Sequence, residues 1–196
     1  MKKLEREEEI RLVQRCLAGE KEALEEFVSL FQKPLFNLAY RLCGNRDDAE
    51  DIAMEALVRA LENLRFFKGE SSLFTWLYRI TVNIFYDNVK KKKELSYDQI
   101  RSDEEDEEER EIDFADEETL ENEVERRNIQ EIVQKEIGKL PAYYRTIIVL
   151  YDIEGFSYEE IGEMLQMPLG TIKSRLNRAR QLLKRRLEKY RELFEG

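Results

Sequence analysis

Apolar residues recur at intervals of three and four positions along most of the chain, which is the spacing of one buried face of an α-helix. Gly19, Pro34 and Gly44 interrupt this pattern in the first half. The helices predicted there cover residues 7–17, 21–31, 34–44, 48–64 and 72–92. In the second half the predicted helices are residues 119–138, Pro141 to Gly155, a short helix behind Ser157, and a last helix opened by Thr171. We therefore expect an all-α protein.

Charge is distributed unevenly along the 196 residues, which carry 33 basic and 43 acidic side chains and a net charge of −10. Residues 94–125 alone hold 17 acidic and 2 basic side chains, whereas residues 171–191 hold nine basic side chains against Glu188 alone. Like charges at the density of 94–125 repel one another, and few apolar residues offset the entropy lost on ordering. We expect residues 94–118 to be an acidic flexible linker that joins two small helical domains. The basic end favours a contact with nucleic acid.

The residue types that the sequence lacks disfavour several classes of protein. Histidine is absent, which removes the commonest metal ligand and the commonest general acid or base. Cys16 and Cys43 cannot form a zinc site alone and suit a reducing cytosol. The longest apolar run, Ile147 to Tyr151, is far shorter than the roughly 20 residues of a membrane-spanning helix. We expect a cytoplasmic protein that does not insert into the membrane and has no catalytic site, metal or cofactor.

Residues 157–180 have the pattern of a helix-turn-helix. Ser157 and Glu160 can form a capping box before a short helix, and Gly162 allows two helices to approach closely. The next helix has a predicted core face of Ile172, Leu176, Ala179 and Leu183. Its opposite face and flanks carry Lys173, Ser174, Arg175, Asn177, Arg178, Arg180 and Gln181. These side chains suit base edges and phosphates in a major groove, and a solvated basic face is the plainer alternative.

A second signal lies in the helix predicted over residues 72–92. Its core face would hold Leu73, Leu77, Ile80 and Ile84, and a separate stripe carries Trp76, Arg79, Asn83 and Tyr86. Residues 66–68 (Phe-Phe-Lys) precede the helix in a loop, and residues 90–93 add four lysines. Aromatic rings stack on unpaired bases, Arg binds phosphate and Asn hydrogen-bonds a base edge. The stripe indicates binding to single-stranded nucleic acid, and simple packing of its aromatic residues is the alternative.

The helix predicted over 48–64 has two unlike faces. Ala49, Ile52, Ala53, Ala56 and Ala60 form a small-residue face for close packing, and the opposite face carries Asp51, Met54, Glu55, Val58 and Glu62. An acidic face with two apolar residues repels DNA and suits a basic, partly apolar protein surface. A solvated charged face is the alternative.

In this order, these segments resemble the extracytoplasmic-function (ECF) sigma factors of bacterial RNA polymerase. The resemblance covers roughly residues 8–93 and 120–190. The strings that carry it are residues 48–53, 74–83, 140–145 and 157–175. It implies a sigma domain 2 over residues 7–93, with polymerase docking at 48–62 and melting and recognition of the −10 promoter element at 65–93. It also implies a sigma domain 4 over residues 119–194, whose helix-turn-helix at 157–180 recognises the −35 element.

The resemblance also implies partners and site residues. The partners are core RNA polymerase, through its β′ clamp helices and β flap, promoter DNA that is duplex at −35 and single-stranded at −10, and an anti-sigma factor. The −35 residues are Thr171, Lys173, Ser174, Arg175, Asn177, Arg178 and Arg180. The −10 residues are Phe67, Lys68, Trp76, Arg79, Asn83, Tyr86, Lys90 and Lys91, with a flipped base held near Phe67, Lys68, Trp76 and Asn83. The polymerase-docking residues are Asp51, Met54, Glu55, Val58 and Glu62.

The chain departs from the family pattern at three places. Met54 stands where the docking string usually carries Gln, Asn177 occupies a variable position, and the acidic linker is longer than the resemblance requires. A solvated spacer is the plainer interpretation of this linker. The sharper hypotheses are that it competes with DNA for the basic helix, or that it occupies a positively charged polymerase channel as a nucleic-acid mimic.

Two other functions are considered. A stand-alone helix-turn-helix regulator explains residues 157–180 but not the aromatic stripe or the acidic face. The chain could also be an enzyme that holds Mg²⁺ in the acidic run, but this run lacks the surrounding apolar residues that would fix metal ligands in octahedral geometry.

Overall fold

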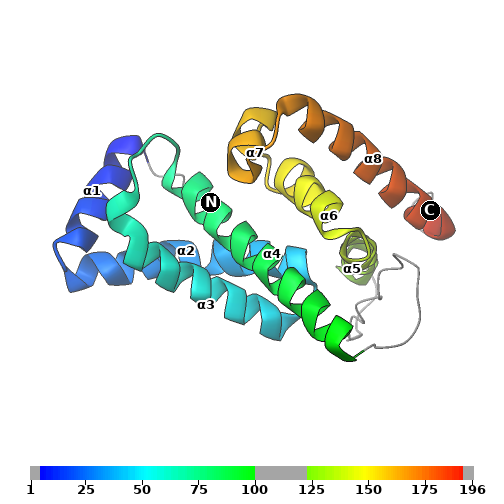
Figure 1. Ribbon diagram of the computed structural model, residues 1–196, viewed down its shortest axis with the longest axis horizontal. Coiled ribbons are helices and arrows are strands. Elements are labelled where there is room, and N and C mark those ends of the chain that lie inside the picture. Colours follow the sequence, from blue (N-terminus) through cyan, green and yellow to red (C-terminus); the bar gives the residue numbers. More distant parts are fainter. Residues whose placement is uncertain (1–4, 100–122, 192–196) are drawn as a thin grey trace. The chain divides into compact units, whose positions relative to one another are not determined.

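The computed structural model describes residues 5–99 and 123–191, and all regular structure within these ranges is helical (Figure 1). The described α-helices are α1 (Arg6–Leu17), α2 (Lys21–Cys43), α3 (Arg46–Asn63), α4 (Leu73–Gln99), α5 (Glu123–Gly138), α6 (Ala142–Ile148), α7 (Tyr158–Leu165) and α8 (Leu169–Leu187). The short turns are η1 (Leu64–Phe66), the π-helical η2 (Val149–Ile153) and η3 (Glu188–Tyr190). The expectation of an all-α protein is confirmed.

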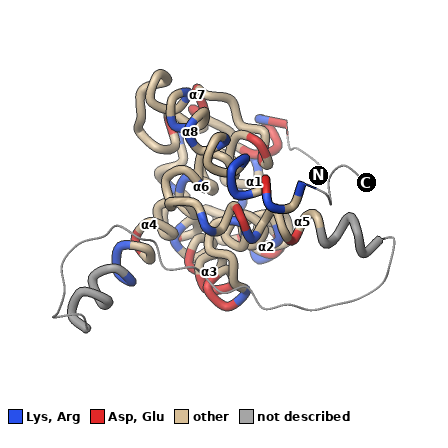
Figure 2. Tube along the Cα trace, turned by 90° about the vertical axis from the view of Figure 1, so that its right-hand side faces the viewer, with Lys and Arg blue, Asp and Glu red and all other residues tan. Residues whose placement is uncertain are grey.

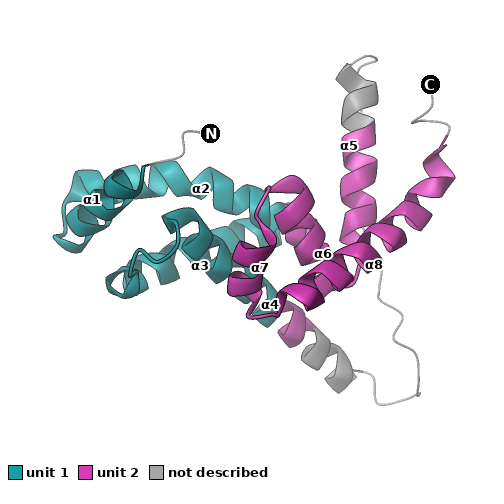
Figure 3. Ribbon diagram, turned by 90° about the horizontal axis from the view of Figure 1, so that it is seen from above, with its two compact units in different colours: residues 1–40, 46–87 teal, residues 41–45, 88–196 magenta. Residues whose placement is uncertain are grey.

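The chain divides into two compact units, which Figure 3 colours separately. The first comprises residues 1–40 and 46–87, and the second comprises residues 41–45 and 88–196. Most of α2, all of α3 and the first half of α4 belong to the first unit, and α5 to α8 belong to the second. The domain boundaries that the sequence suggested, 7–93 and 119–194, stay a prediction.

One long helix, α2, replaces the two helices predicted over 21–31 and 34–44. Proline lacks a backbone N–H and usually begins or ends a helix, but Pro34 lies inside α2. Phe31 and Leu35, on either side of it, are 1% and 0% exposed. The predicted break was wrong because burial of this continuous apolar face outweighs the disruption by proline, about 3 kcal/mol.

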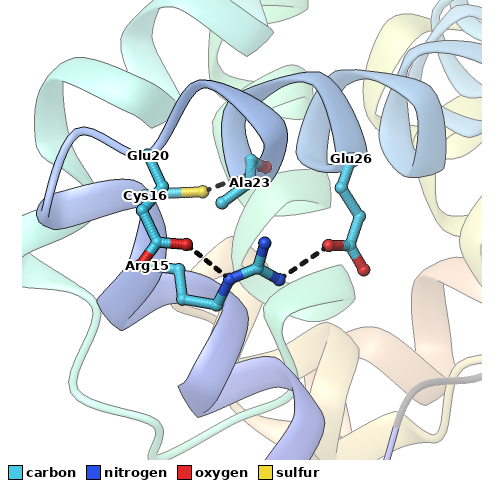
Figure 4. A network of polar contacts seen from close by, with 5 residues as sticks. All are labelled: Arg15, Cys16, Glu20, Ala23 and Glu26. Carbon is cyan, nitrogen blue, oxygen red and sulfur yellow. Dashed lines mark hydrogen bonds and ion pairs between the residues drawn. The ribbon is translucent and has the colours of Figure 1, made fainter.

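A polar network holds α1 against α2 (Figure 4). The Arg15 guanidinium donates to Glu20 at 2.8 Å and to Glu26 at 2.9 Å. Beside it, the buried Cys16 thiol donates to the Ala23 carbonyl at 3.3 Å. Burial raises the pKa of the Cys16 thiol, which keeps the thiol protonated and able to donate. These contacts hold α1 and α2 together at the turn that joins them.

The small-residue face of α3 is buried as predicted, and none of Ala49, Ile52, Ala53, Ala56 and Ala60 is more than 4% exposed. The helix begins at Arg46, two residues before the predicted start. Its other end leads into residues 65–72, which we call the 65–72 loop and whose first two residues belong to η1. Arg59 of α3 lies 3.7 Å from Asp87 of α4, so the two helices also meet through an ion pair.

Ser72 caps the start of α4, because its hydroxyl oxygen accepts a hydrogen bond from the Thr75 N–H at 3.0 Å. On the core side, the Phe74 ring packs edge-on against Phe31 of α2 at a centroid distance of 5.3 Å.

The helix α4 continues to Gln99 instead of ending near Lys92. The predicted linker was therefore wrong for residues 94–99, which contain neither Gly nor Pro and precede the acidic run at 103–109. The rest of the predicted linker, residues 100–118, lies outside the described residues.

In the second unit, α5, α6 and α7 each pack against α8. Pro141 precedes α6 as predicted, and the last turn of that helix widens into η2. The capping box of α7 is confirmed, with Ser157 Oγ accepting from the Glu160 N–H at 3.2 Å and Glu160 Oε2 accepting from the Ser157 N–H at 2.8 Å. α8 begins at Leu169, two residues before the predicted Thr171, because Pro168 supplies its extended N-cap.

Glu136 of α5 forms a buried charge cluster with the C-terminal end of α8 and with η3. The carboxylate is 0% exposed and accepts a hydrogen bond from the Tyr190 hydroxyl at 3.1 Å. Its cationic neighbours are Lys189 at 3.1 Å, Lys139 at 3.6 Å and Arg186 at 4.0 Å. Burial favours a higher pKa for Glu136, but hydrogen bonds from Lys189 and Tyr190 and the nearby lysine charges outweigh it and lower the pKa.

Candidate nucleic-acid interfaces

The turn between α7 and α8 has the geometry of a helix-turn-helix. Gln166 ends α7 in the left-handed conformation, at φ +52°, and the Met167 N–H donates to the Gly162 carbonyl at 3.0 Å. A Cβ atom at Gly162 would lie only 3.0 Å from the Met167 carbonyl oxygen. Gly162 therefore lets the turn approach α7 closely, as the sequence suggested, and a side chain there would crowd the Met167 carbonyl.

The helix-turn-helix presents one face of α8 outward. Ile172, Leu176 and Ala179 are at most 2% exposed, and Leu183 is half-buried. The predicted −35 residues lie on the other sides of the helix. Lys173, Ser174, Asn177, Arg178 and Arg180 are exposed, whereas Thr171 and Arg175 are half-buried. Figure 2 colours the cations of α8 blue. The face that the helical spacing predicted is thus available to a ligand.

Three of these cations lie over tyrosine rings that the sequence analysis did not single out. The pairs are Lys173 with Tyr158 at 5.3 Å, Arg175 with Tyr143 at 5.4 Å and Arg180 with Tyr151 at 5.3 Å from the ring centroid. Such cation–π contacts restrict the rotamers of long side chains. The outward cations of α8 are thereby partly preorganised before any ligand binds.

Asp152 is an acidic residue within this basic surface. Its carboxylate accepts two hydrogen bonds from Arg180, one of them from Nε at 3.1 Å. This pairing raises the pKa of Arg180 further above its ordinary range. The guanidinium is thus fixed in orientation, and part of its charge is compensated inside the protein.

The 65–72 loop places aromatic side chains beside the start of α4. The Phe67 ring contacts Trp76 at a centroid distance of 5.5 Å and an angle of 58° between the rings. Phe66 is 59% exposed, and Lys68 is also exposed. Of the four residues proposed to hold a flipped base, the structure thus brings Phe67 and Trp76 into contact.

The remaining −10 candidates follow one another along α4. Arg79, Asn83, Lys90 and Lys91 are exposed, and Trp76 and Tyr86 are half-buried. Asn83 lies seven residues after Trp76, a rise of about 10 Å along the helix. The whole stripe from Trp76 to Lys91 spans about 22 Å. The arrangement is an extended track on one helix, long enough for several nucleotides, with the aromatic pair at one end.

The residues predicted to dock on polymerase lie on the outer face of α3, and acidic residues are red in Figure 2. Met54 and Val58 are 59% and 48% exposed and lie one helical turn apart, so they form a small apolar patch on this face. Asp51 and Glu62 are exposed as well. Glu55 is half-buried and lies 2.6 Å from Arg59, so its charge is partly compensated.

Within residues 5–99 and 123–191, no three side chains of the metal-binding types come together as ligands would. In the same part of the chain, no helix has both the length and the apolar character needed to cross a membrane.

Comparisons with known proteins agree with the architecture. The family models of Sigma-70 region 2 and Sigma-70, region 4 match residues 27–94 and 130–183. The chain is 36% identical over 183 residues to the ECF RNA polymerase sigma factor SigW of Bacillus subtilis, covering 86% of this chain and 91% of that one. It is 34% identical to the ECF RNA polymerase sigma-E factor of Haemophilus influenzae, covering 90% and 94%.

A solved structure shows the same relationship. The sigma factor RpoE of Bartonella quintana, in complex with the anti-sigma factor NepR, superimposes with a TM-score of 0.62 at 28% identity. The superposition covers 84% of this chain and 96% of that one. The relatives, the two family models and the all-helical architecture together show that the chain belongs to the ECF RNA polymerase sigma factors.

Proposed function

We propose that this chain directs core RNA polymerase to promoters by recognising two DNA elements with two separate surfaces. The helix-turn-helix of α7 and α8 binds the −35 element as duplex. The 65–72 loop and α4 bind the −10 element as an unpaired strand and so stabilise the melted promoter. The chain acts in the bacterial cytoplasm, where polymerase and DNA are, and its role is recognition and strand separation without a catalytic step of its own.

The observation that carries this proposal is the outer face of α8. Ser174, Asn177 and Arg178 are exposed along one side of a helix that is anchored by buried residues on its other side. Serine, asparagine and arginine hydrogen-bond base edges in the major groove. Thr171, Lys173, Arg175 and Arg180 flank this line and bind phosphates, which fix the register of the helix on DNA.

The −10 surface is supported by the kinds of side chain along α4. A base that leaves the stack loses stacking energy, and an aromatic platform such as Phe67 with Trp76 returns about 1–3 kcal/mol per base. Asn83 hydrogen-bonds a base edge, while Arg79, Lys90 and Lys91 follow the phosphates. These side chains bind bases that are stacked and paired inside duplex DNA, so they stabilise the single strand over the duplex.

Docking on polymerase is assigned to α3, through Asp51, Met54, Glu55, Val58 and Glu62. An acidic rim around Met54 and Val58 complements a basic, partly apolar surface such as the β′ clamp helices, and the second unit would also contact the β flap. Polymerase then holds both DNA-binding surfaces at promoter spacing, so that two weak contacts act as one tight contact. Because RpoE of Bartonella quintana was solved with an anti-sigma factor, we also propose a partner of that class for this chain.

The test is a band-shift and abortive-transcription assay with purified core RNA polymerase on a promoter library. We expect polymerase-dependent binding and RNA synthesis from promoters that share two sequence elements. Arg178→Ala should lose selectivity at −35 by about tenfold per contacted base pair, because a good base contact contributes about 1–3 kcal/mol. Asn83→Ala should lose selectivity at −10.

Arg185→Ala is the matched control for Arg178, because it removes an exposed arginine from the same helix, outside the proposed contact set. It should leave selectivity unchanged. Tight binding to one duplex site without polymerase, and no transcription with it, would overturn the proposal and favour a stand-alone helix-turn-helix regulator.

A further inference from the structure

The first turn of α1 reaches the 65–72 loop, which lies far from it in the sequence (Figure 1). The Arg6 guanidinium donates to the Gly69 carbonyl, and the Glu9 carboxylate accepts a hydrogen bond from the Leu73 N–H at 3.1 Å. The first contact joins residues that are 63 positions apart in the sequence, and the second joins residues that are 64 positions apart. They attach α1 to the two ends of the segment Gly69 to Leu73.

Glu9 is the more constrained of the two α1 residues. Its side chain is only 5% exposed, so its desolvated charge needs hydrogen-bond partners inside the protein. Leu73 is the first residue of α4, whose first N–H groups have no partner within the helix. The Glu9 carboxylate accepts a hydrogen bond from the Leu73 N–H and also interacts favourably with the positive end of the helix dipole. The Ser72 hydroxyl oxygen accepts a hydrogen bond from the Thr75 N–H, so two N–H groups in the first turn of α4 have partners.

Gly69 is the point at which the loop turns. It is buried and has φ +70°, a conformation that side-chain-bearing residues rarely adopt. A Cβ atom at this position would have Ile10 of α1 as its nearest neighbour, at 4.0 Å. Arg6 and Ile10 therefore hold the turn from one side. Between this anchor and the buried Leu64, the chain exposes Phe66 and Lys68.

We propose that Glu9 and Arg6 are positioning residues for promoter recognition: α1 sets the conformation in which the 65–72 loop presents Phe67 and Lys68 to an unpaired −10 base. This inference rests on the proposed function and extends it to a helix outside the matched Sigma-70 region 2, which begins at residue 27. Neither residue touches DNA in this account. They act through the loop and through the start of α4, where Trp76 receives Phe67.

The first measurement needs no polymerase. Trp76 is the single tryptophan of the chain and packs against Phe67, so its fluorescence reports the position of the loop. Arg6→Ala removes an exposed side chain and leaves the core intact, whereas Glu9→Ala removes a buried one. We expect both variants to shift Trp76 emission and to increase its quenching by acrylamide by about twofold. Glu7→Ala, an exposed carboxylate in the same turn, is the matched control and should leave both unchanged.

The second measurement uses the full chain with core RNA polymerase on forked promoters whose single-stranded −10 bases are substituted one at a time. We expect Arg6→Ala and Glu9→Ala to lower discrimination at one −10 position about fivefold. Core binding and affinity for a −35 duplex should be retained. Glu9→Gln keeps a hydrogen-bond acceptor for the Leu73 N–H and should restore most of the discrimination, and Glu7→Ala should match wild type.

Each other outcome has a defined meaning. If Arg6→Ala lowers binding to every −10 sequence equally, or leaves Trp76 fluorescence and discrimination unchanged, the inference is overturned, because α1 then serves stability alone. Arg6→Ala decides the matter should Glu9→Ala fail to fold. If the wild-type chain with polymerase shows no −10 discrimination at all, the proposed function fails as well. The wild-type measurement therefore distinguishes failure of the proposed function from failure of the positioning role of α1.

Discussion

Asp152 places a negative charge within the surface that we assign to −35 DNA, and its neutralisation should strengthen binding. Asp152→Asn keeps an oxygen that accepts from Arg180 but removes the repulsion between a carboxylate and phosphate. Exposed ion pairs are worth about 1 kcal/mol or less. We therefore expect the affinity of the full chain for a −35 duplex to rise about threefold at low salt, measured by fluorescence anisotropy, and the gain to disappear at high salt.

The control for Asp152→Asn is Glu131→Gln, which makes the same change in net charge on an exposed position of α5. It should leave the affinity unchanged. A weaker complex with Asp152→Asn would contradict the prediction and would mean that Asp152 orients Arg180 for its phosphate.

Glu136 should stabilise the second unit in a pH-dependent way. Its pKa is lowered in the folded protein, so its contribution is present above the ordinary value of 4.5 and is lost as the pH falls through the folded pKa. Glu136→Gln should lower the free energy of unfolding by about 2 kcal/mol at pH 7, because charged hydrogen bonds are lost. Urea unfolding followed by circular dichroism should show this difference at pH 7 and a smaller one at pH 3.5. A difference that stayed constant with pH would contradict the assignment.

Residue by residue, helical spacing predicted most of the exposed positions of α8 and α4, because the side of a helix opposite its buried face usually meets solvent. Trp76 and Tyr86 on α4, and Thr171 and Arg175 on α8, are half-buried instead. Helical spacing did not find the tyrosines under the α8 cations, or Asp152. Tyr143, Tyr151 and Tyr158 come from α6, η2 and α7, and their meeting with α8 depends on how those elements pack. Glu9 was missed for the same reason, since only the fold brings it to Leu73.

At the scale of elements, Gly162 and Gly170 allow a paired test of the helix-turn-helix. A Cβ atom at Gly162 would press on the Met167 carbonyl at 3.0 Å, whereas one at Gly170 would meet nothing within 4 Å. Gly162→Ala should lower the free energy of unfolding by about 1–3 kcal/mol, the usual effect of overpacking. Gly170→Ala should be neutral or stabilise by up to about 1 kcal/mol, because alanine favours a helix. Urea unfolding of both variants measures the difference, and equal effects would show that the turn yields easily.

Local signals located some element boundaries and missed others. The Ser157–Glu160 capping box was predicted correctly because it involves residues only three positions apart. The continuation of α2 through Pro34 depends on burial against the rest of the first unit, which sequence spacing does not show. The extension of α4 to Gln99 was missed because the lysines at 90–93 looked like a boundary in charge, although nothing there breaks a helix.

For the whole molecule, the opposite charges of its parts determine how it meets DNA. The acidic run at 103–109 holds seven carboxylates, and residues 171–191 hold nine cations on the same chain. An acidic segment tethered to a basic surface competes with DNA at a high effective concentration. The free chain should therefore bind DNA weakly, and polymerase would relieve the competition by offering the acidic segment another basic surface.

Neutralising that run tests the competition directly. Replacing the seven carboxylates at 103–109 by Asn and Gln changes the net charge from −10 to −3. We expect polymerase-free affinity for duplex DNA to rise about fivefold at 50 mM salt. The difference should vanish near 0.5 M salt, where screening acts within about 4 Å. The control exchanges Asp for Glu and Glu for Asp at the same positions, which keeps every charge and should keep the wild-type affinity. Equal affinities for all three proteins at every salt concentration would mean that the acidic segment does not reach the basic helix. The same result would exclude the net charge of the whole chain as the cause of weak binding, because the substituted chain carries −3 instead of −10.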